Sequence, residues 1–314
     1  MEVASKFELH YYLSNNSHQI NALLRNNCEA EILAILSEIS SVLDIEAELI
    51  ATAARIGGFR EFWDVIKGNA AAITILLLVA QLLVTIAPML HESEKEELEK
   101  ELIELQIKES ELNIKNLRKE LKGEEISEKA MEKALDQLRN NFKIMKRRSN
   151  LYATLNASQD VIQIGFAVLN SSFSEVIEEK KVPRREFSKY ILSSNKLKSE
   201  EVETEIEIVS PVLKEGNYKW KGIFNDQKIS FDMLDLAFRD MVLLDSVSFQ
   251  HGSRILCVLR IQRELDEIGD TKITGYSVTT VIEKFDGSTT VETTQGKKYR
   301  HAKKLIDGQG KLFS

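Results

Sequence analysis

An uncharged segment, residues 69–90, constrains the fold more than any other feature of the chain. Its sequence is NAAAITILLLVAQLLVTIAPML, in a chain where 29% of residues are charged. A helix needs about 20 apolar residues to cross the hydrocarbon of a bilayer, whereas a helix on a globular domain normally has one face in water. Because apolar residues surround this whole segment, the sequence predicts a transmembrane helix over 68–90. The alternative is a helix buried in the core of an oligomer.

The energetics of this segment favour the bilayer. Eleven of its residues are Leu, Ile or Val, and each contributes about −0.3 to −0.6 kcal/mol to insertion, or about −3 to −7 kcal/mol in total. Gln81 lies near the middle, where an amide either bonds a partner helix or is simply tolerated. The residues expected to define the membrane helix are Ile73, Leu76, Leu77, Gln81, Leu83 and Ile86.

The residues before the segment have the composition of a membrane interface. Phe59, Phe62 and Trp63 are aromatics of the kind found at headgroup level, and Lys67 is a cation beside them. Three Lys or Arg precede the segment within 15 residues and two follow it, so the positive-inside rule slightly favours a cytoplasmic N-terminus. The cysteines favour a reducing compartment for the larger C-terminal part. We expect the bacterial inner membrane with that part in the cytoplasm; the alternative is a cytoplasmic protein.

Charge patterning predicts an antiparallel coiled-coil hairpin over 91–150. Residues 91–111 carry nine Glu against three Lys, and residues 112–148 carry eleven Lys or Arg against six acids. Folding back at Gly123 places the cations of 146–148 beside the acidic first arm, where each exposed ion pair contributes about 0.2 to 1 kcal/mol. The second arm has the spacing of a and d positions: Met131, Leu135, Leu138, Phe142 and Met145.

The flanking regions predict a small helical module and a β domain. FELHYYLS (7–14) alternates and predicts a strand, and residues 18–56 predict helices, so residues 1–67 form a mostly helical module. Residues 151–290 predict a mostly antiparallel β domain, because alternating segments are separated by turn signals such as EGN and DGS. Covering helices are expected at 183–192 and 233–244.

Two charged segments of the C-terminal part are candidate binding sites. Glu201, Glu203, Glu205 and Glu207 share one face of a strand, and they either hold a cation or basic partner or form the wet side of a sheet. Residues 291–314 form a basic tail that either binds an anionic partner or is simply solvated. The possible anion contacts in this tail are Lys297, Lys298, Arg300, Lys303 and Lys304.

No residue pattern in the chain points to catalysis. There is no P-loop, dinucleotide fingerprint, nucleophile elbow or zinc-ligand spacing, so we expect no enzymatic activity, cofactor or metal. His10 and His18, near Tyr11 and Tyr12, form the densest polar and aromatic cluster, for which structural roles are expected. The N-terminus lacks the regions of a signal peptide.

Charge and cysteine content exclude further classes. The net charge of −7 argues against a general affinity for nucleic acid. Cys28 and Cys257 lie far apart in apolar sequence, which predicts two buried thiols rather than a disulfide framework.

These observations predict an α+β protein with an ordered series of parts. The expected divisions are a helical module (1–67), a membrane helix (68–90), a coiled-coil hairpin (91–150), a β domain (151–290) and a basic tail (291–314). We expect a self-associating membrane protein whose β domain binds a partner or signal, with use as a bacterial defence or toxic effector that perturbs the inner membrane. The alternatives are a soluble homo-oligomeric assembly or adaptor protein, and a nucleic-acid-binding or nuclease-like protein that uses the β domain and tail.

Overall fold

The alternation of FELHYYLS builds the middle strand of a five-stranded sheet. This strand, β1 (Lys6–Leu13), turns Phe7, Leu9 and Tyr11 into a hydrophobic core, where each is at most 1% exposed. The residues between them lie on the opposite face, because successive side chains of a strand point to opposite sides. The predicted strand and its two faces are confirmed.

The computed structural model divides the chain into two compact units. Unit 1 comprises Met1–Ser194 with Glu267–Asp270, and unit 2 comprises Asn195–Asp266 with Thr271–Ser314. The predicted divisions at residues 67, 90 and 150 all fall within unit 1. The residues that the structure describes are 3–14, 19–52, 59–86, 134–135, 138–139, 141–244, 246–287 and 289–310.

The sheet of unit 1 is antiparallel throughout, with the strand order β2-β3-β1-β4-β5. The chain runs β1, α1, β2, β3, α2 and then, through α5, into β4. This connectivity and the order of the first four strands are those of the split βαβ (ferredoxin-like) motif, with β5 added at the β4 edge. The further strands are β2 (Glu48–Thr52), β3 (Phe59–Ile66), β4 (Val161–Leu169) and β5 (Glu175–Pro183).

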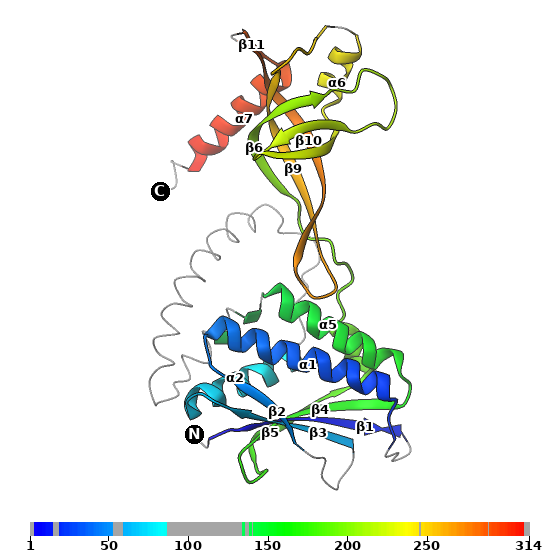
Figure 1. The fold of residues 1–314 in the computed structure, drawn as a ribbon, viewed down its shortest axis with the longest axis vertical. Helices are drawn as coiled ribbons and strands as arrows, with labels where there is room; N and C mark the ends of the chain where they lie inside the picture. Colours follow the sequence, from blue (N-terminus) through cyan, green and yellow to red (C-terminus); the bar gives the residue numbers. More distant parts are fainter. Residues whose placement is uncertain are drawn as a thin grey trace. The chain divides into compact units, whose positions relative to one another are not determined.

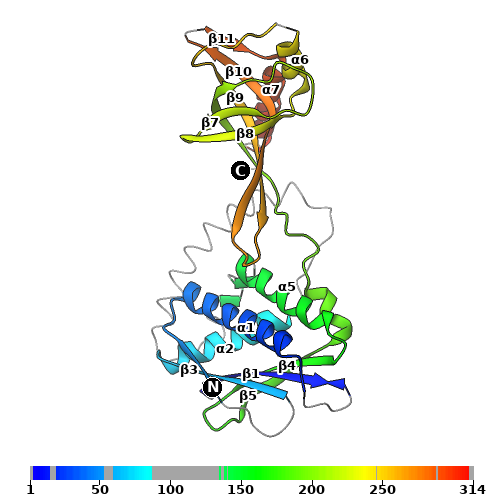
Figure 2. The ribbon, with the colours of Figure 1, turned by 45° about the vertical axis from the view of Figure 1, so that its right-hand side comes forward.

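Three helices cover one face of this sheet, as Figures 1 and 2 show. They are α1 (Ala22–Leu43), α2 (Ala70–Thr85) and α5 (Phe142–Ala157). Helix α1 packs against α5 and α2, and α2 packs against β4 and β5. A short 3₁₀ helix, η2 (Arg184–Tyr190), follows β5 and packs against α5.

Helix α2 is the hydrophobic segment, and protein surrounds it on all sides. Leu76 and Leu77 are fully buried, and Ile73 and Leu83 are 7% and 3% exposed, whereas Ile86 at the end is 36% exposed. The helix is 16 residues long, or about 24 Å at 1.5 Å per residue. Among the described residues, no helix has the length and apolarity that a membrane crossing requires. The transmembrane helix predicted over 68–90 is therefore not found, and α2 is a core helix of unit 1.

Gln81, for which the sequence left open a bond to a partner helix or mere toleration, bonds to the sheet beneath α2. Its side-chain amide donates to the carbonyl oxygens of Phe166 and Glu178 at 2.8 and 3.2 Å. Phe166 lies at an irregularity in the pairing of β4 with β5, where ladder hydrogen bonds are interrupted. The amide therefore supplies donors that the ladder lacks at this point.

The C-terminal carbonyls of α2 are also satisfied by side chains within unit 1. Arg148 Nη1 donates to Leu83 O and Ile86 O at 2.8 and 3.1 Å. Tyr152 Oη donates to Val84 O at 2.7 Å, and Tyr190 Oη to Thr85 O at 2.8 Å. The last turn of a helix leaves carbonyls without intrahelical partners, and burying them unpaired is costly. Three side chains thus remove the free-energy cost of burying these carbonyls unpaired.

A second helix was predicted to begin near residue 45, and the aromatics of 59–63 were predicted to lie at a membrane interface. Both predictions are wrong for the described residues, which form two paired strands. Glu48–Thr52 is strand β2 and pairs with β3. In β3, Trp63 is 2% exposed in the core, and Phe62 is 4% exposed on the opposite face. Phe59 is partly buried against the core, and Lys67 pairs with Glu48 at 2.7 Å. The aromatics are spaced for the two sides of a strand.

The predicted coiled-coil hairpin falls largely outside the described residues, Met131 and the acidic first arm included, and no such hairpin is shown. Leu138 is fully buried and Leu135 partly buried in the core of unit 1. In α5, Met145 is half-buried and Phe142 is 46% exposed. Of the cations expected to pair with the first arm, Arg147 Nη1 lies 3.2 Å from Glu31 Oε2 on α1.

Unit 2 is a closed β-barrel. Its strands follow the order β6-β7-β8-β10-β9, and β9 pairs with β6 to complete the ring, while β11 extends β10. All pairings are antiparallel except that of β8 with β10. The strands are β6 (Glu200–Ser210), β7 (Trp220–Phe224), β8 (Gln227–Met233), β9 (Arg254–Leu265), β10 (Thr271–Asp286) and β11 (Thr289–Glu292).

This strand order is that of the five-stranded Greek-key barrel known as the OB arrangement. Helix α6 (Leu236–Leu243) connects β8 to β9 in the chain, and α7 (Thr294–Gly310) packs beside β10 (Figure 1). The core groups Trp220, Phe231 and Phe238 with the inward residues of all five strands. A mostly antiparallel β region was predicted for residues 151–290, and the α+β class is confirmed.

We predict that Tyr152→Phe destabilises unit 1 by about 1–2 kcal/mol, because Val84 O stays buried and loses its donor. The ring itself, fully buried between Phe187 and Tyr190, is kept. Urea unfolding monitored by circular dichroism measures the change. Tyr218→Phe, at a side chain that is 57% exposed, is the matched control and should change nothing. Equal stability of Tyr152→Phe and wild type would contradict the assigned role.

Candidate functional site

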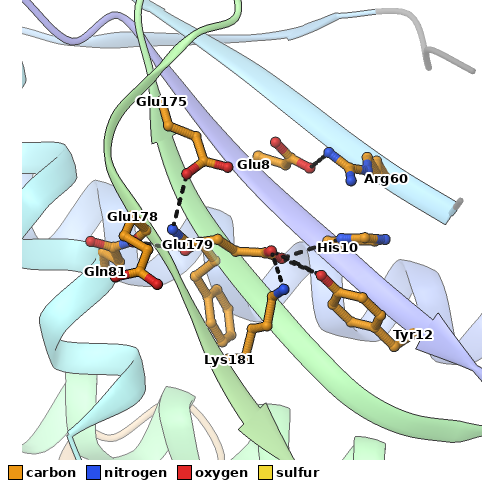
Figure 3. Close-up of polar contacts among 10 residues, drawn as sticks. Glu8, His10, Tyr12, Arg60, Gln81, Glu175, Glu178, Glu179 and Lys181 are labelled. Carbon is orange, nitrogen blue, oxygen red and sulfur yellow. Dashed lines mark hydrogen bonds and ion pairs between the residues drawn. The ribbon is translucent and has the colours of Figure 1, made fainter. Parts of the chain in front are cut away.

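A polar network crosses the face of the unit 1 sheet that no described helix covers (Figure 3). Its centre is Glu179 on β5. His10 Nδ1 lies 3.2 Å from Glu179 Oε1, Tyr12 Oη donates to Oε2 at 2.8 Å, and Lys181 Nζ lies 3.1 Å from Oε2. Beside it, Arg60 Nη1 donates to Glu8 Oε1 at 2.8 Å. Residues of β1, β3 and β5 thus converge on one face.

A glycine on β4 makes this convergence possible. Gly165 lies between His10 on one side and Lys181 on the other in the strand register. A Cβ at this position would collide with Glu179 Oε1. Without a side chain here, the Glu179 carboxylate lies over β4 and reaches the imidazole two strands away.

The electrostatics of the network favour fixed charges over proton transfer. Glu179 is buried, which by itself raises its pKa, but the hydrogen bonds from His10, Tyr12 and Lys181 outweigh this and lower the pKa to about 2. Hydrogen bonds to Tyr12 and Glu179 raise the pKa of Lys181 to about 12. Burial raises the pKa of Glu8 against the effect of Arg60. The network is therefore a set of mutually neutralising groups.

The sequence placed His10 and Tyr12 in a polar and aromatic cluster, and their rings lie 3.9 Å apart. His18 lies outside the described residues. Tyr11 points to the helix side, where its hydroxyl donates to Glu61 Oε2 at 3.1 Å. Glu179 and Lys181 carried no signal in the sequence, because only the pairing of β4 with β5 brings them to β1.

The two cysteines are buried in separate cores, as predicted. Cys28 and Cys257 are both 0% exposed. Burial raises the pKa of Cys28 to about 12 and raises that of Cys257 as well, so neither thiol is a ready nucleophile or ligand. Among the described residues, no group of three His, Cys, Asp or Glu is placed to hold a metal ion.

The outer surface of β7 and β8 in unit 2 carries a row of lysines. Lys221 pairs with Ser230, and Ile223 pairs with Lys228, so these side chains share the outward face. Both lysines are exposed, and within the described part of the chain neither forms an ion pair. Lys219 continues the row and lies 3.3 Å from Asp232. We call Lys219, Lys221 and Lys228 the lysine face.

Strand β6, which pairs with β7 on one side and β9 on the other, carries several ion pairs. Glu201 and Glu205 lie 2.8 Å from Arg260 and Arg254 of β9, and Glu203 lies 2.7 Å from Lys303 of α7. Three of the four glutamates of the row are thus engaged within unit 2, whereas Glu207 is exposed opposite Ile223 of β7. The predicted basic tail is helical in α7, where Arg300 bonds Glu283 and Glu292 at 2.8 and 2.9 Å. Lys297, Lys298 and Lys304 are exposed.

Charge is divided unevenly between the units. Unit 2 contains 18 Lys and Arg against 17 Asp and Glu, whereas unit 1 contains 24 against 32. The acidity of the whole chain therefore resides in unit 1. Net negative charge therefore disfavours nucleic-acid binding by unit 1 but not by the barrel.

Comparisons of the chain with protein-family models, with curated proteins and with solved structures found no match. The likeness of the two units to the split βαβ and OB arrangements therefore rests on strand order and pairing.

We predict that the stabilising effect of Glu179 depends on pH. Its pKa is lowered from 4.5 to about 2 in the folded state, so its contribution is complete above pH 4.5 and is lost as the pH falls towards 2. Glu179→Gln should cost up to about 3 kcal/mol at pH 6 and progressively less below pH 4.5. Urea unfolding across this range measures both proteins. The neighbouring, exposed Glu178→Gln is the control, and a pH-independent effect of Glu179→Gln would contradict the assignment.

Proposed function

We propose that unit 2 binds single-stranded nucleic acid along the lysine face of β7 and β8. The observation that carries the proposal is the pair of exposed lysines, Lys221 and Lys228, on the second and third strands of a barrel with OB order. In barrels of this order, that face and the loop between the first two strands bind oligonucleotides and oligosaccharides.

Strand order by itself does not decide function, because one fold serves many functions. The charges of this face select between the two ligand classes. Lysines gain from neutralising phosphates and from the release of counterions, whereas an uncharged oligosaccharide gains nothing from them. The loop between β6 and β7 adds Lys214 and the 57% exposed ring of Tyr218, which suits stacking on an unpaired base.

The membrane-effector function predicted from the sequence stays a prediction. It would require α2 to leave the core of unit 1 and Gln81 to give up its bonds to β4 and β5. The self-associating assembly or adaptor also stays a prediction. We place the function in unit 2, since its lysine face offers charges to an outside ligand.

We predict that Lys221→Gln with Lys228→Gln weakens binding of a labelled single-stranded oligonucleotide several-fold in fluorescence anisotropy. The slope of log affinity against log salt should become shallower by about 0.7 for each lysine removed. An oligonucleotide of about 15 nucleotides covers the site, and a duplex of the same sequence should bind less well.

The matched control is Lys297→Gln with Lys298→Gln, which removes two exposed lysines from α7 of the same unit. This variant should bind as wild type does. No binding by wild type, or a loss confined to the α7 variant, would contradict the proposal. The latter result would assign binding to the basic segment singled out in the sequence.

A further inference from the structure

A cavity of about 580 Å³ lies beside the lysine face, between the β6–β7 loop and α6. Its volume falls in the range of small-ligand sites. The lining includes the rings of Tyr218 and Trp220, and the polar side chains of Asn217, Asp232, Arg239 and Asp240. Because Asp232 lines the cavity and lies 3.3 Å from Lys219, a strand bound along the lysine face passes this cavity.

The walls of the cavity are held in place by the local sequence. Asp235 caps α6 by accepting from Phe238 N at 3.0 Å, and its other oxygen accepts from Val281 N of β10 at 2.7 Å. On the loop side, Gly216 has a φ of 139°, and a Cβ there would collide with the Tyr218 ring. Glycine adopts this conformation without strain, which lets the ring lie against the loop.

Arg239 presents an unused donor. Its Nε is buried and has no hydrogen-bond partner among the described residues, and Arg239 lines the cavity. A buried donor without a partner is unfavourable, and such groups are rare in folded proteins. Because this Nε is itself closed to solvent, an acceptor on a ligand in the cavity would bond Arg239 through its Nη groups.

The other charges of the cavity define which ligand supplies that acceptor. Asp240 follows Arg239 in α6 and, within the described part of the chain, forms no ion pair. A free phosphate would suit Arg239 but would meet Asp240 and Asp232. A ligand that fits must therefore offer adjacent acceptors to a guanidinium and adjacent donors to a carboxylate, on a flat ring that stacks on Tyr218.

Guanine meets these requirements with two hydrogen bonds on each side. Its O6 and N7 accept from an arginine in a bidentate pair, and its N1–H and N2–H₂ donate together to a carboxylate. We propose that this cavity binds a guanine base of the strand held by the lysine face, with Arg239 at O6 and N7 and Asp240 at N1 and N2. This inference rests on the proposed function and adds a base preference to it.

The test compares two labelled strands, one of thymine alone and one of thymine with a single central guanine, by fluorescence anisotropy with the full chain. The guanine strand should bind about 10-fold more tightly. Replacing the guanine by 7-deazaguanine, which lacks the N7 acceptor, or by hypoxanthine, which lacks the N2 amine, should each remove most of this gain. These arms alter the ligand alone, so they are independent of protein folding.

Arg239→Met should bring the guanine strand down to the affinity of the thymine strand and leave the thymine strand unchanged. The unchanged affinity shows that the variant is folded. The control Lys221→Gln should weaken both strands by the same factor. Equal binding of both strands by wild type overturns the guanine inference and leaves the proposed function standing, whereas failure of both strands to bind overturns both.

Discussion

The burial of α2, with the carbonyls of its last turn bonded by side chains of α5 and η2, is the constraint on which unit 1 depends. This helix packs against α1, β4 and β5, and Gln81 bonds to the backbone of β4 and β5. At its end, Arg148, Tyr152 and Tyr190 bond carbonyls that would otherwise be buried without donors. The same side chains bring α5 and η2 onto the helix. Polar groups of β4, β5, α5 and η2 thus bond to this apolar helix and hold these four elements against it.

Hydropathy correctly predicted that α2 is a helix with apolar surroundings. It could not distinguish a protein core from the lipid of a bilayer. Lipid tails are about as apolar as leucine side chains, so a helix enclosed by protein and one enclosed by lipid have the same composition. The aromatics of β3 strengthened the membrane prediction, because Phe62 and Trp63 also suit a headgroup region. Their alternate burial on the two faces of a strand is the signal that sequence analysis missed.

Local sequence patterns predicted individual strands and their faces, but they did not predict which strands pair. The alternation of β1 gave both its faces, and the turn-rich C-terminal part was predicted as β. The network around Glu179 depends on the register of β4 with β5 and on the absence of a Cβ at Gly165, neither of which has a local signature. The barrel likewise closes through the parallel pairing of β8 with β10. The glutamate row of β6 was noticed, but its partners on β9 and α7 are remote in sequence.

Gln81→Leu tests the central claim most directly, because lipid and protein surroundings demand opposite outcomes. If α2 is a core helix, leucine at position 81 leaves Phe166 O and Glu178 O without this donor. The free energy of unfolding of unit 1 should then fall by about 1–3 kcal/mol. Urea unfolding of the full chain without detergent measures this change. Gln159→Leu, at an exposed glutamine, should change nothing. In a membrane helix, the same substitution would replace a polar group by a favourable apolar one. Unchanged or increased stability of Gln81→Leu would contradict the account.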